Sequence, residues 1–424
     1  MKKLKIFLLF ISIVGNISIN IAQIQDDEII IPDRKNAVEQ QEKPYVILIS
    51  VDGFRHDYFE KYNPEFLNQQ KEKGVFAEAM IPSFPSVTFP NHYTIVTGML
   101  PPHHGLVGNN IYNREEQTYY SIRNKKAVEN PDWYGGFPLW SLAESQNLLT
   151  ACYYWPGSEA PIKGFSPTYH FPYSERKTVE KRIEKVKDWL NLPAEKRPHF
   201  ITFYMPDVDH AGHRYGPDAL ETEFAVKFAD ATIQKLVKEV NKTDLPVNFI
   251  FVSDHGMTAV DVKNPIQIPE IDSEKAQIAS SGTYLSVFTE NEKIKDSLFQ
   301  VFKSEESSQY KTYLKADVPE KYKFSSKEDK HNRIGDLVLI AEAPYYFARS
   351  KRFVSPGAHG YLPEDTPEMN TVFLAWGPDF QKGKKIKAFK NIHVFPLLAE
   401  LLELEYNHKI DGDKRLIPLV LKKK

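Results

Sequence analysis

Acidic residues and histidines that follow short apolar runs are the side chains of this sequence with the clearest chemical potential. Three such runs, Tyr45–Val51, His199–Met205 and Val247–Ser253, are typical of buried strands. Ligands bind beyond the carboxyl ends of strands in open α/β sheets, so we expect the side chains that follow these runs to meet. The candidates are Asp52, Asp209, His213, Asp254 and His255, joined by His359 from a glycine-flanked loop. Oxygen and nitrogen ligands without cysteine favour Zn²⁺ in a catalytic rather than a structural role.

Thr88 is the candidate nucleophile. Asn91–Thr97 is predicted to be a helix that Gly98 ends, and Pro85 excludes a helix upstream, so Thr88 lies at the N-cap position of that helix. A hydroxyl at this place can simply cap the helix, but a helix N-terminus also suits a phosphate group. Coordination to a metal ion favours the alkoxide of such a hydroxyl without a neighbouring base. Two ions roughly 4 Å apart would clamp the attacking and leaving oxygens of a phosphoryl displacement.

Six stretches carry a family resemblance that covers nearly all of the chain after its N-terminal segment. They are Ile-Ser-Val-Asp-Gly-Phe-Arg (49–55), Thr-Phe-Pro-Asn-His-Tyr (88–93), His-Gly-Leu-Val-Gly-Asn (104–109), Gly-His-Arg-Tyr-Gly-Pro (212–217), Ser-Asp-His-Gly-Met (253–257) and Gly-Ala-His-Gly (357–360). In this order they resemble the nucleotide pyrophosphatase/phosphodiesterase family, within the alkaline phosphatase superfamily. The resemblance implies an α/β fold with an alkaline phosphatase-like central, largely parallel sheet flanked by helices.

The resemblance also implies a role for each matching residue. It places one zinc ion on Asp209, His213 and His359, and a second on Asp52, Asp254, His255 and Thr88. Asn109 matches an asparagine that donates to a non-bridging phosphate oxygen, and with the Thr88 backbone N–H it would stabilise charge in the transition state. Phe89, Trp155 and Tyr173 match the positions that enclose the base of a nucleotide, although as bare sequence such aromatic residues are more often core.

The sequence departs from the family pattern in two places. The family commonly has Glu-Pro before the ligand aspartate, whereas here Pro206 precedes Asp207, and the spacing to Gly212-His213 selects Asp209 instead. Vertebrate members often place a lysine before the nucleophile, and here that residue is Val87, which leaves a preference for triphosphates open. The nearby histidines 92, 103, 104 and 210 match no ligand position and are assigned to packing or supporting hydrogen bonds.

The elements that must position these residues are predicted over residues 44–424, as a catalytic domain. Helical spacing over 175–190 and 218–240 predicts two helices that cover the sheet. Residues 270–345 mix strand-like runs with a helix near 292–302 and are expected to form a small α+β insertion. A further buried strand is expected at 370–376, and a closing helix at 396–402 with Pro396 at its start.

Composition narrows the setting of the protein. Lys plus Arg is 54 against Asp plus Glu 56, so the charge balance gives no reason to expect a nucleic-acid-binding patch. Residues 1–22 are typical of a secretory signal peptide, and residues 23–43 are expected to be a flexible leader. No later run is apolar enough to span a membrane, and the single cysteine, Cys152, cannot form an internal disulfide. The sequence therefore predicts an exported bacterial protein of the periplasm or cell surface.

The sequence thus predicts a two-zinc hydrolase that cleaves nucleotide phosphodiester or phosphoanhydride bonds to a nucleoside 5′-monophosphate through a phospho-threonine. One alternative on the same scaffold is an enzyme for choline or glycerol phosphodiesters, or for phosphomonoesters. Another is a non-catalytic exported binding protein, which a complete set of charged ligands disfavours because an empty site gives no reason to keep them.

Overall fold

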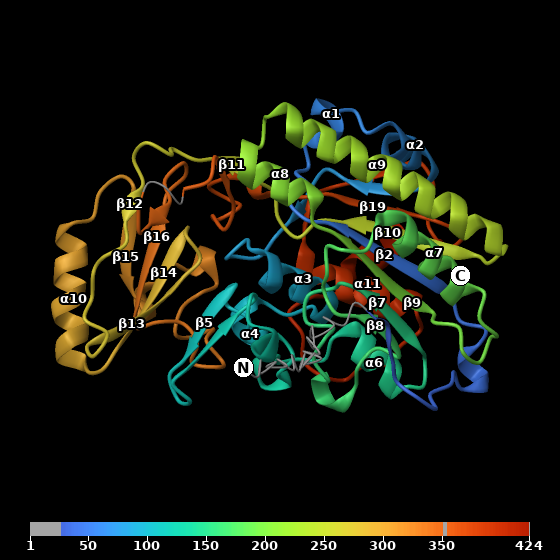
Figure 1. The fold of residues 1–424 in the computed structure, drawn as a ribbon, viewed down its shortest axis with the longest axis horizontal. Coiled ribbons are helices and arrows are strands. Elements are labelled where there is room, and N and C mark those ends of the chain that lie inside the picture. The colour runs from blue at the N-terminus through green and yellow to red at the C-terminus, as the bar shows by residue number, and fades with distance from the viewer. Residues whose placement is uncertain (1–26, 351–353, 424) are drawn as a thin grey trace, which may run out of the picture.

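The computed structural model describes residues 27–350 and 354–423, and the expected signal peptide at 1–22 lies outside them. A large central sheet runs through the main body, and a smaller sheet stands beside it (Figure 1). The central sheet has the order β1-β8-β7-β9-β2-β10-β19-β3-β20. In that order its strands are Ile29–Ile30, Tyr169–Phe171, Thr150–Tyr153, Phe200–Met205, Tyr45–Val51, Val247–Val252, Phe373–Trp376, Val75–Ala77 and Lys384–Ile386.

Parallel pairing dominates the middle of this sheet, as the continuous apolar runs predict. β2 pairs in parallel with β9 on one side and with β10 on the other, while β1 and β19 pair with their neighbours antiparallel. All seven residues of β2 are buried, which requires cover on both faces of the sheet. The expectation of a largely parallel, alkaline phosphatase-like sheet is confirmed.

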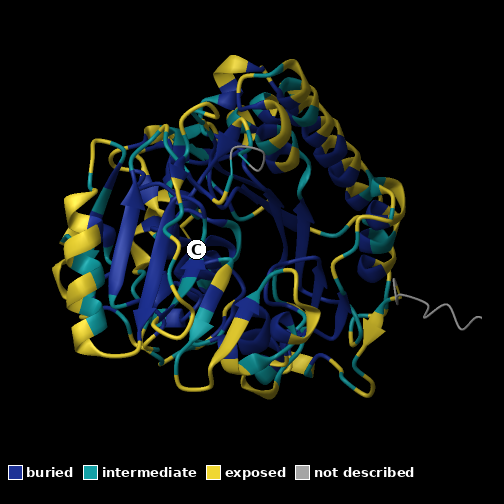
Figure 2. Ribbon diagram, turned by 60° about the vertical axis from the view of Figure 1, so that its left-hand side comes forward, coloured by how far each residue is buried: buried dark blue, intermediate teal, exposed yellow. Residues whose placement is uncertain are grey.

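Alternate residues of β2 pack into two separate cores. Val46 and Leu48 join the core under α3 (Thr88–Thr97), α6 (Leu139–Ser145) and α11 (Val394–Leu401). Ile47 and Ile49 join the opposite core, under α7 (Val179–Leu190) and α9 (Leu220–Val240). The strands are buried between these helices (Figure 2), of which α7 and α9 expose their outer faces while α3, α6 and α11 are almost entirely buried. Two-sided cover of this kind holds the carboxyl ends of the central strands in fixed positions.

A second sheet forms within the segment predicted as an insertion. Its order is β13-β14-β16-β15, all pairs antiparallel, with α10 (Glu292–Ser304) lying outside it (Figure 1). The strands span Ala276–Ser280, Tyr284–Thr289, Leu337–Ala341 and Tyr310–Leu314 in that order. The hairpin of β5 (Asn110–Asn113) and β6 (Thr118–Ser121) packs β5 against β13, so the insertion borders the loop that carries Asn109.

The expected flexible leader is wrong for residues 27–43, which pack onto the main body. β1 extends the central sheet by pairing with β8, and Arg34 forms a salt bridge to the buried Glu144. Asn36 donates to the carbonyls of Ala194 and Arg197. The polar side chains of this segment therefore bind backbone carbonyl and carboxylate groups that are distant in sequence.

The closing helix also differs in detail from its prediction. α11 begins at Val394, so Pro396 lies inside the first turn, where a missing N–H still costs no helical hydrogen bond.

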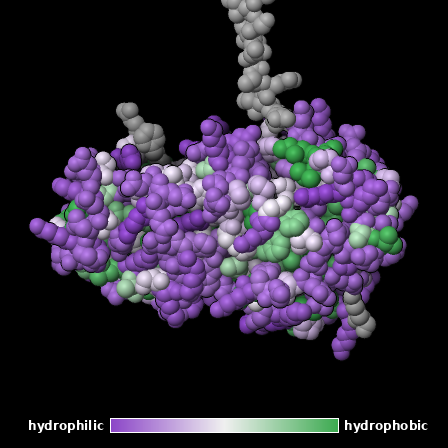
Figure 3. Space-filling view, turned by 90° about the horizontal axis from the view of Figure 1, so that it is seen from below, coloured by the Kyte–Doolittle hydropathy of each residue, from purple (hydrophilic) through white to green (hydrophobic). Residues whose placement is uncertain are grey.

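Among the described residues, no helix is long and apolar enough to cross a membrane. The face of the molecule seen in Figure 3 is largely hydrophilic, with apolar side chains only in separate patches.

Candidate metal centre and active site

Three neighbouring parallel strands deliver the three predicted aspartates to one place. Asp52 directly follows β2, Asp254 lies two residues after β10, and Asp209 lies in the first turn of α8 (Asp207–Tyr215), which follows β9. Gly53 permits this convergence. It adopts φ 73°, and a Cβ atom at this position would lie 2.9 Å from the Asp209 Cα atom.

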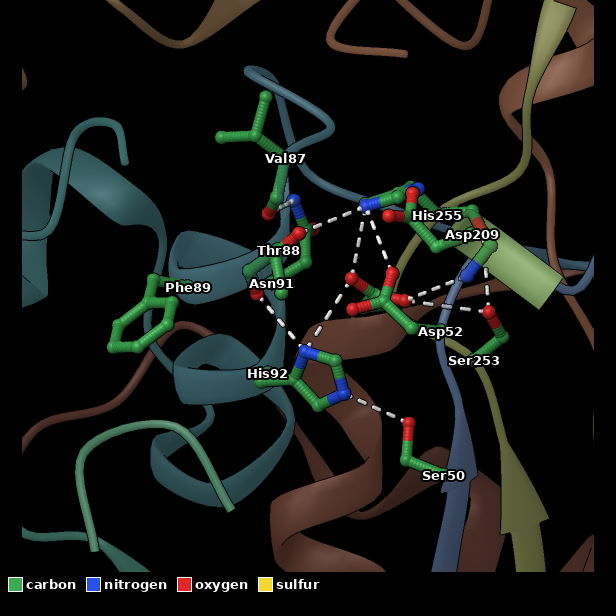
Figure 4. Close-up of polar contacts among 12 residues, drawn as sticks. Ser50, Asp52, Val87, Thr88, Phe89, Asn91, His92, Asp209, Ser253 and His255 are labelled. Atoms are coloured by element: carbon green, nitrogen blue, oxygen red, sulfur yellow. Dashed lines mark hydrogen bonds and ion pairs between the residues drawn. The ribbon is translucent and has the colours of Figure 1, made fainter. Parts of the chain in front are cut away.

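Asp52, Asp254 and His255 form one group of potential metal ligands, with one ligand atom of each within 4.8 Å of the others. His255 Nε2 lies 3.0 Å from Asp254 Oδ2 and 3.3 Å from Asp52 Oδ1. The Thr88 hydroxyl lies 3.2 Å from the same nitrogen, so the candidate nucleophile borders this group (Figure 4).

Asp209, His255 and His359 form a second group that meets the same distance limit. His213 lies beside it, with Nε2 3.4 Å from Asp209 Oδ1 and 3.0 Å from His359 Nε2. The His255 and His359 rings stack at 3.5 Å between centroids, which brings the two groups side by side. Asp209 belongs to the group and Asp207 does not, as the spacing to His213 predicts.

Backbone carbonyl groups set the orientation of all three histidines. Nδ1 of His213, His255 and His359 lies 2.8, 2.8 and 3.0 Å from the carbonyl oxygens of Gly357, Gly256 and Ser86 respectively. A carbonyl oxygen only accepts, so each Nδ1 carries the hydrogen and each Nε2 presents a lone pair. The three Nε2 atoms therefore converge in the form that a metal ion requires.

The charges of this site are unbalanced without a cation. Asp52 Oδ1, Asp209 Oδ1 and Asp254 Oδ2 are buried and have no hydrogen-bond partner within the described ranges. Imidazole nitrogens lie close to them, such as His255 Nε2 and His92 Nδ1 at 3.0 and 3.3 Å from Asp254 Oδ2. Burial, and then the negative charges of Asp254 and Asp209, raise the pKa of Asp52 well above its usual value. Buried carboxylates need pairing or a metal, so this donor set fits divalent cations.

Thr88 is the first residue of α3 and not its cap. Val87 holds the N-cap position with φ −124°, and Gly98 ends the helix at φ 67° in the left-handed region. The expectation that Thr88 sits at the N-cap is therefore wrong by one residue. Its hydroxyl contacts His255, and its backbone N–H lies at the start of α3, where a helix terminus favours a phosphate group.

Asn109 lies next to the start of the same helix. Its side-chain oxygen accepts the Phe89 backbone N–H at 3.1 Å. Because this bond assigns the oxygen, the carboxamide NH₂ is the end available to donate to a ligand.

The three aromatic residues predicted around a base have different environments. Tyr173 is 44% exposed and Phe89 is partly buried, so both can contact a ligand. Trp155 is only 1% exposed, and its Nε1–H donates to the His92 carbonyl at 3.2 Å. The observed contacts of Trp155 support α3, and its contact with a base stays a prediction.

Tyr204, at the end of β9, is a site residue that the sequence did not indicate. Its hydroxyl donates to Asp52 Oδ2 at 2.6 Å. In the sequence, Tyr204 lies two residues before Pro206, a position that indicates the end of a strand but not a contact with Asp52.

Comparison with known proteins identifies the family of this chain. The chain matches the family described as type I phosphodiesterase / nucleotide pyrophosphatase over residues 46–362. The chain belongs to this family. It is 34% identical over 380 residues to venom phosphodiesterase 2 of Crotalus adamanteus, covering 86% of this chain and 46% of that protein. It is 32% identical over 378 residues to an uncharacterized pyrophosphatase/phosphodiesterase of Schizosaccharomyces pombe, covering 85% of this chain and 77% of that one.

A solved relative extends the similarity to the fold of the family. Murine ectonucleotide pyrophosphatase / phosphodiesterase 5, an inactive variant in complex with AMP, aligns with a TM-score of 0.82 at 26% identity. The alignment covers 90% of this chain and all of that one. The chain spans less than half the length of the venom phosphodiesterase.

Proposed function

We propose that the protein is a two-zinc phosphodiesterase/pyrophosphatase that releases nucleoside 5′-monophosphates. The observation that carries the proposal is the convergence of three aspartates without hydrogen-bond donors and three oriented imidazoles beside the Thr88 hydroxyl. Asp209, His213 and His359 would hold one ion, and Asp52, Asp254, His255 and Thr88 the other. Oxygen and nitrogen donors of this kind are typical of catalytic zinc.

Bound zinc would supply Lewis acidity toward the phosphate oxygens and would lower the pKa of the Thr88 hydroxyl. Thr88 Oγ attacks phosphorus, its proton leaves to solvent, and the bond to the leaving alcohol or phosphate breaks. The phospho-threonine is then hydrolysed by water to regenerate the hydroxyl. The Asn109 NH₂ group and the Thr88 N–H donate to the non-bridging oxygens, where negative charge increases.

The surroundings of Thr88 favour a diester over a monoester. A monoester dianion carries one more charged oxygen, which an enzyme of that type meets with an additional cation. Val87 and Phe89, the neighbours of Thr88, are apolar, and Arg55 is paired with Asp57, with Arg55 Nη2 2.6 Å from Asp57 Oδ2. In this proposal Phe89 and Tyr173 enclose a planar base, which would contribute about 1–3 kcal/mol by stacking.

The proposal is tested with nitrophenyl esters of thymidine monophosphate, of phosphorylcholine and of phosphate. We expect kcat/KM to be highest for the nucleotide ester, and Phe89→Ala to lower that value by about 5- to 100-fold while leaving nitrophenyl phosphate unchanged. Equal turnover of the three esters would contradict the nucleotide assignment. Preference for the phosphorylcholine ester would identify the alternative enzyme on this scaffold.

The covalent step has its own test at Thr88. Thr88→Ala should lose at least about 10³-fold in kcat while still binding zinc, whereas Thr88→Ser should keep part of the rate because a hydroxyl remains. A chiral substrate should show retention of configuration at phosphorus, because two displacements occur. Inversion would mean that water attacks phosphorus directly.

We also propose that the protein acts after export, in the periplasm or at the cell surface. The lysine-rich start and apolar run of residues 1–22 support this setting. Cell fractionation, with recovery of a chain that begins near Gln23, would test it.

A further inference from the structure

Tyr204 lies on β9, next to the strand that ends at Asp52, and is 7% exposed. Its hydroxyl donates to Asp52 Oδ2 at 2.6 Å, across 152 residues of chain. A carboxylate oxygen only accepts, so the phenol O–H of Tyr204 is the donor in this bond. A short bond of this kind to a carboxylate is a strong one.

This bond determines which oxygen of Asp52 is available to an ion. Tyr204 occupies Oδ2, whereas Oδ1 is buried without a hydrogen-bond donor and lies 3.3 Å from His255 Nε2. Asp254 shows the same division by other means. Its Oδ1 atom lies 3.3 Å from both the Gly53 N–H nitrogen and the Ser253 hydroxyl, and its Oδ2 atom faces His255 Nε2 at 3.0 Å and His92 Nδ1 at 3.3 Å. Each carboxylate therefore has one oxygen that accepts hydrogen bonds from the protein and one oxygen that faces His255 Nε2.

The Tyr204 ring is itself held in place by its neighbours. It packs edge-on against His92, with centroids 5.2 Å apart, and against Tyr173, with centroids 6.1 Å apart. The buried Arg182 guanidinium donates to the Tyr204 carbonyl oxygen. A ring fixed on two sides presents its hydroxyl in one direction, which is what a group that orients a ligand must do.

We propose that Tyr204 is a positioning residue that holds Asp52 in the geometry for metal binding at the site of Asp52, Asp254 and His255. This inference rests on the proposed function. The loss of a group that orients a metal ligand typically weakens metal affinity by about 10–100-fold. The ion held by Asp209, His213 and His359 should be unaffected, because Tyr204 donates to none of these side chains.

The test compares Tyr204→Phe with Tyr169→Phe. Both tyrosines are 7% exposed in the central sheet, but the Tyr169 hydroxyl donates to the Lys196 carbonyl at 2.9 Å, away from the site. Zinc affinity is measured by competition with a chelator of known affinity. We expect Tyr204→Phe to weaken one of two zinc ions by about 10–100-fold, and Tyr169→Phe to bind both like the wild type.

Two further readouts separate positioning from a general loss of structure. The thermal midpoint of the metal-free Tyr204→Phe protein should equal that of the metal-free wild type, while the rise in midpoint caused by zinc should be smaller. Excess zinc should restore kcat to within roughly a few-fold of the wild type, because saturation compensates a loss of zinc affinity alone. Wild-type affinity for both ions in Tyr204→Phe would overturn the inference and leave the proposed function standing. A wild-type protein that binds no zinc would overturn both.

Discussion

Two buried acidic sites in this molecule, Glu144 and the aspartates at the strand ends, differ in how many hydrogen bonds their oxygens accept. Glu144 in α6 accepts hydrogen bonds from the backbone N–H and hydroxyl groups of both Thr150 and Thr168, and it pairs with Arg34. Asp52 and Asp254, at the carboxyl ends of the strands, each leave one oxygen without a donor. Complete pairing is what a structural carboxylate needs, and its absence at the strand ends indicates a cation.

The largest expected difference is in the enzymatic activity of variants at the two acidic sites. Asp254→Asn should lower kcat/KM for the nucleotide ester by about 10³-fold or more, because a charged ligand of one ion is lost. The stability of its metal-free form should change little, because removing a negative charge beside Asp52 is offset by weaker contacts of residue 254 with His255 and His92. Enzyme assays and thermal unfolding would measure both quantities.

Asp207→Asn is the matched control, because Asp207 begins α8 but lies outside both ligand groups. It should keep most of the activity. If Asp207→Asn were the more damaging of the two, the ligand after β9 would be misassigned.

Glu144→Gln should show the opposite behaviour. An amide cannot accept all the hydrogen bonds that the carboxylate accepts, and it leaves Arg34 without its buried counter-charge, so we expect a loss of about 3 kcal/mol in unfolding free energy. Zinc content and kcat should be those of the wild type. Urea denaturation measures the loss. A fall in zinc content at unchanged stability would mean that Glu144 supports metal binding and not the fold.

A smaller effect is expected at His103, a partly buried histidine that lies between two carboxylates. Its Nδ1 lies 2.8 Å from Asp411 Oδ2 and its Nε2 lies 2.7 Å from Glu328 Oε2. The hydrogen bond with Asp411, opposed by burial and supported by Glu328, raises the pKa of His103. His104 and His331 also interact with His103, and burial is the main cause that lowers the pKa of each.

A raised pKa in the folded state means that the contribution of His103 to stability is complete below about pH 6.5 and is lost as the pH rises through the folded value. The stability difference between wild type and His103→Gln should therefore be largest near pH 5–6 and should shrink toward pH 9. Denaturant titrations at several pH values would show this trend. A difference that does not change with pH would mean that packing, not charge, explains the contribution.

The parts of the fold that sequence could predict are those set by local pattern. Tyr45–Val51 is found as β2 with the expected bounds, because a continuous apolar run ended by Asp52-Gly53 allows no other arrangement in a two-sided sheet. The aspartates after β2, β9 and β10 were predicted to meet because parallel strands end at one edge of a sheet.

The parts that could not be predicted depend on contacts between distant segments. Tyr204 meets Asp52 only once β9 lies beside β2, and Arg34 meets Glu144 only once β1 has joined the sheet. Trp155 follows a strand, as a ligand contact would, but its burial under α3 is a property of packing and not of spacing.

The most direct test of the account is the metal content of the purified wild-type protein, measured with the rate of nucleotide ester hydrolysis. We predict close to two zinc ions per chain, complete loss of turnover after chelation, and recovery of turnover when zinc is returned. Zinc should also raise the thermal midpoint, since it binds the folded protein and relieves the repulsion among Asp52, Asp209 and Asp254. Full activity in protein freed of metal would contradict the central claim that these aspartates are ligands.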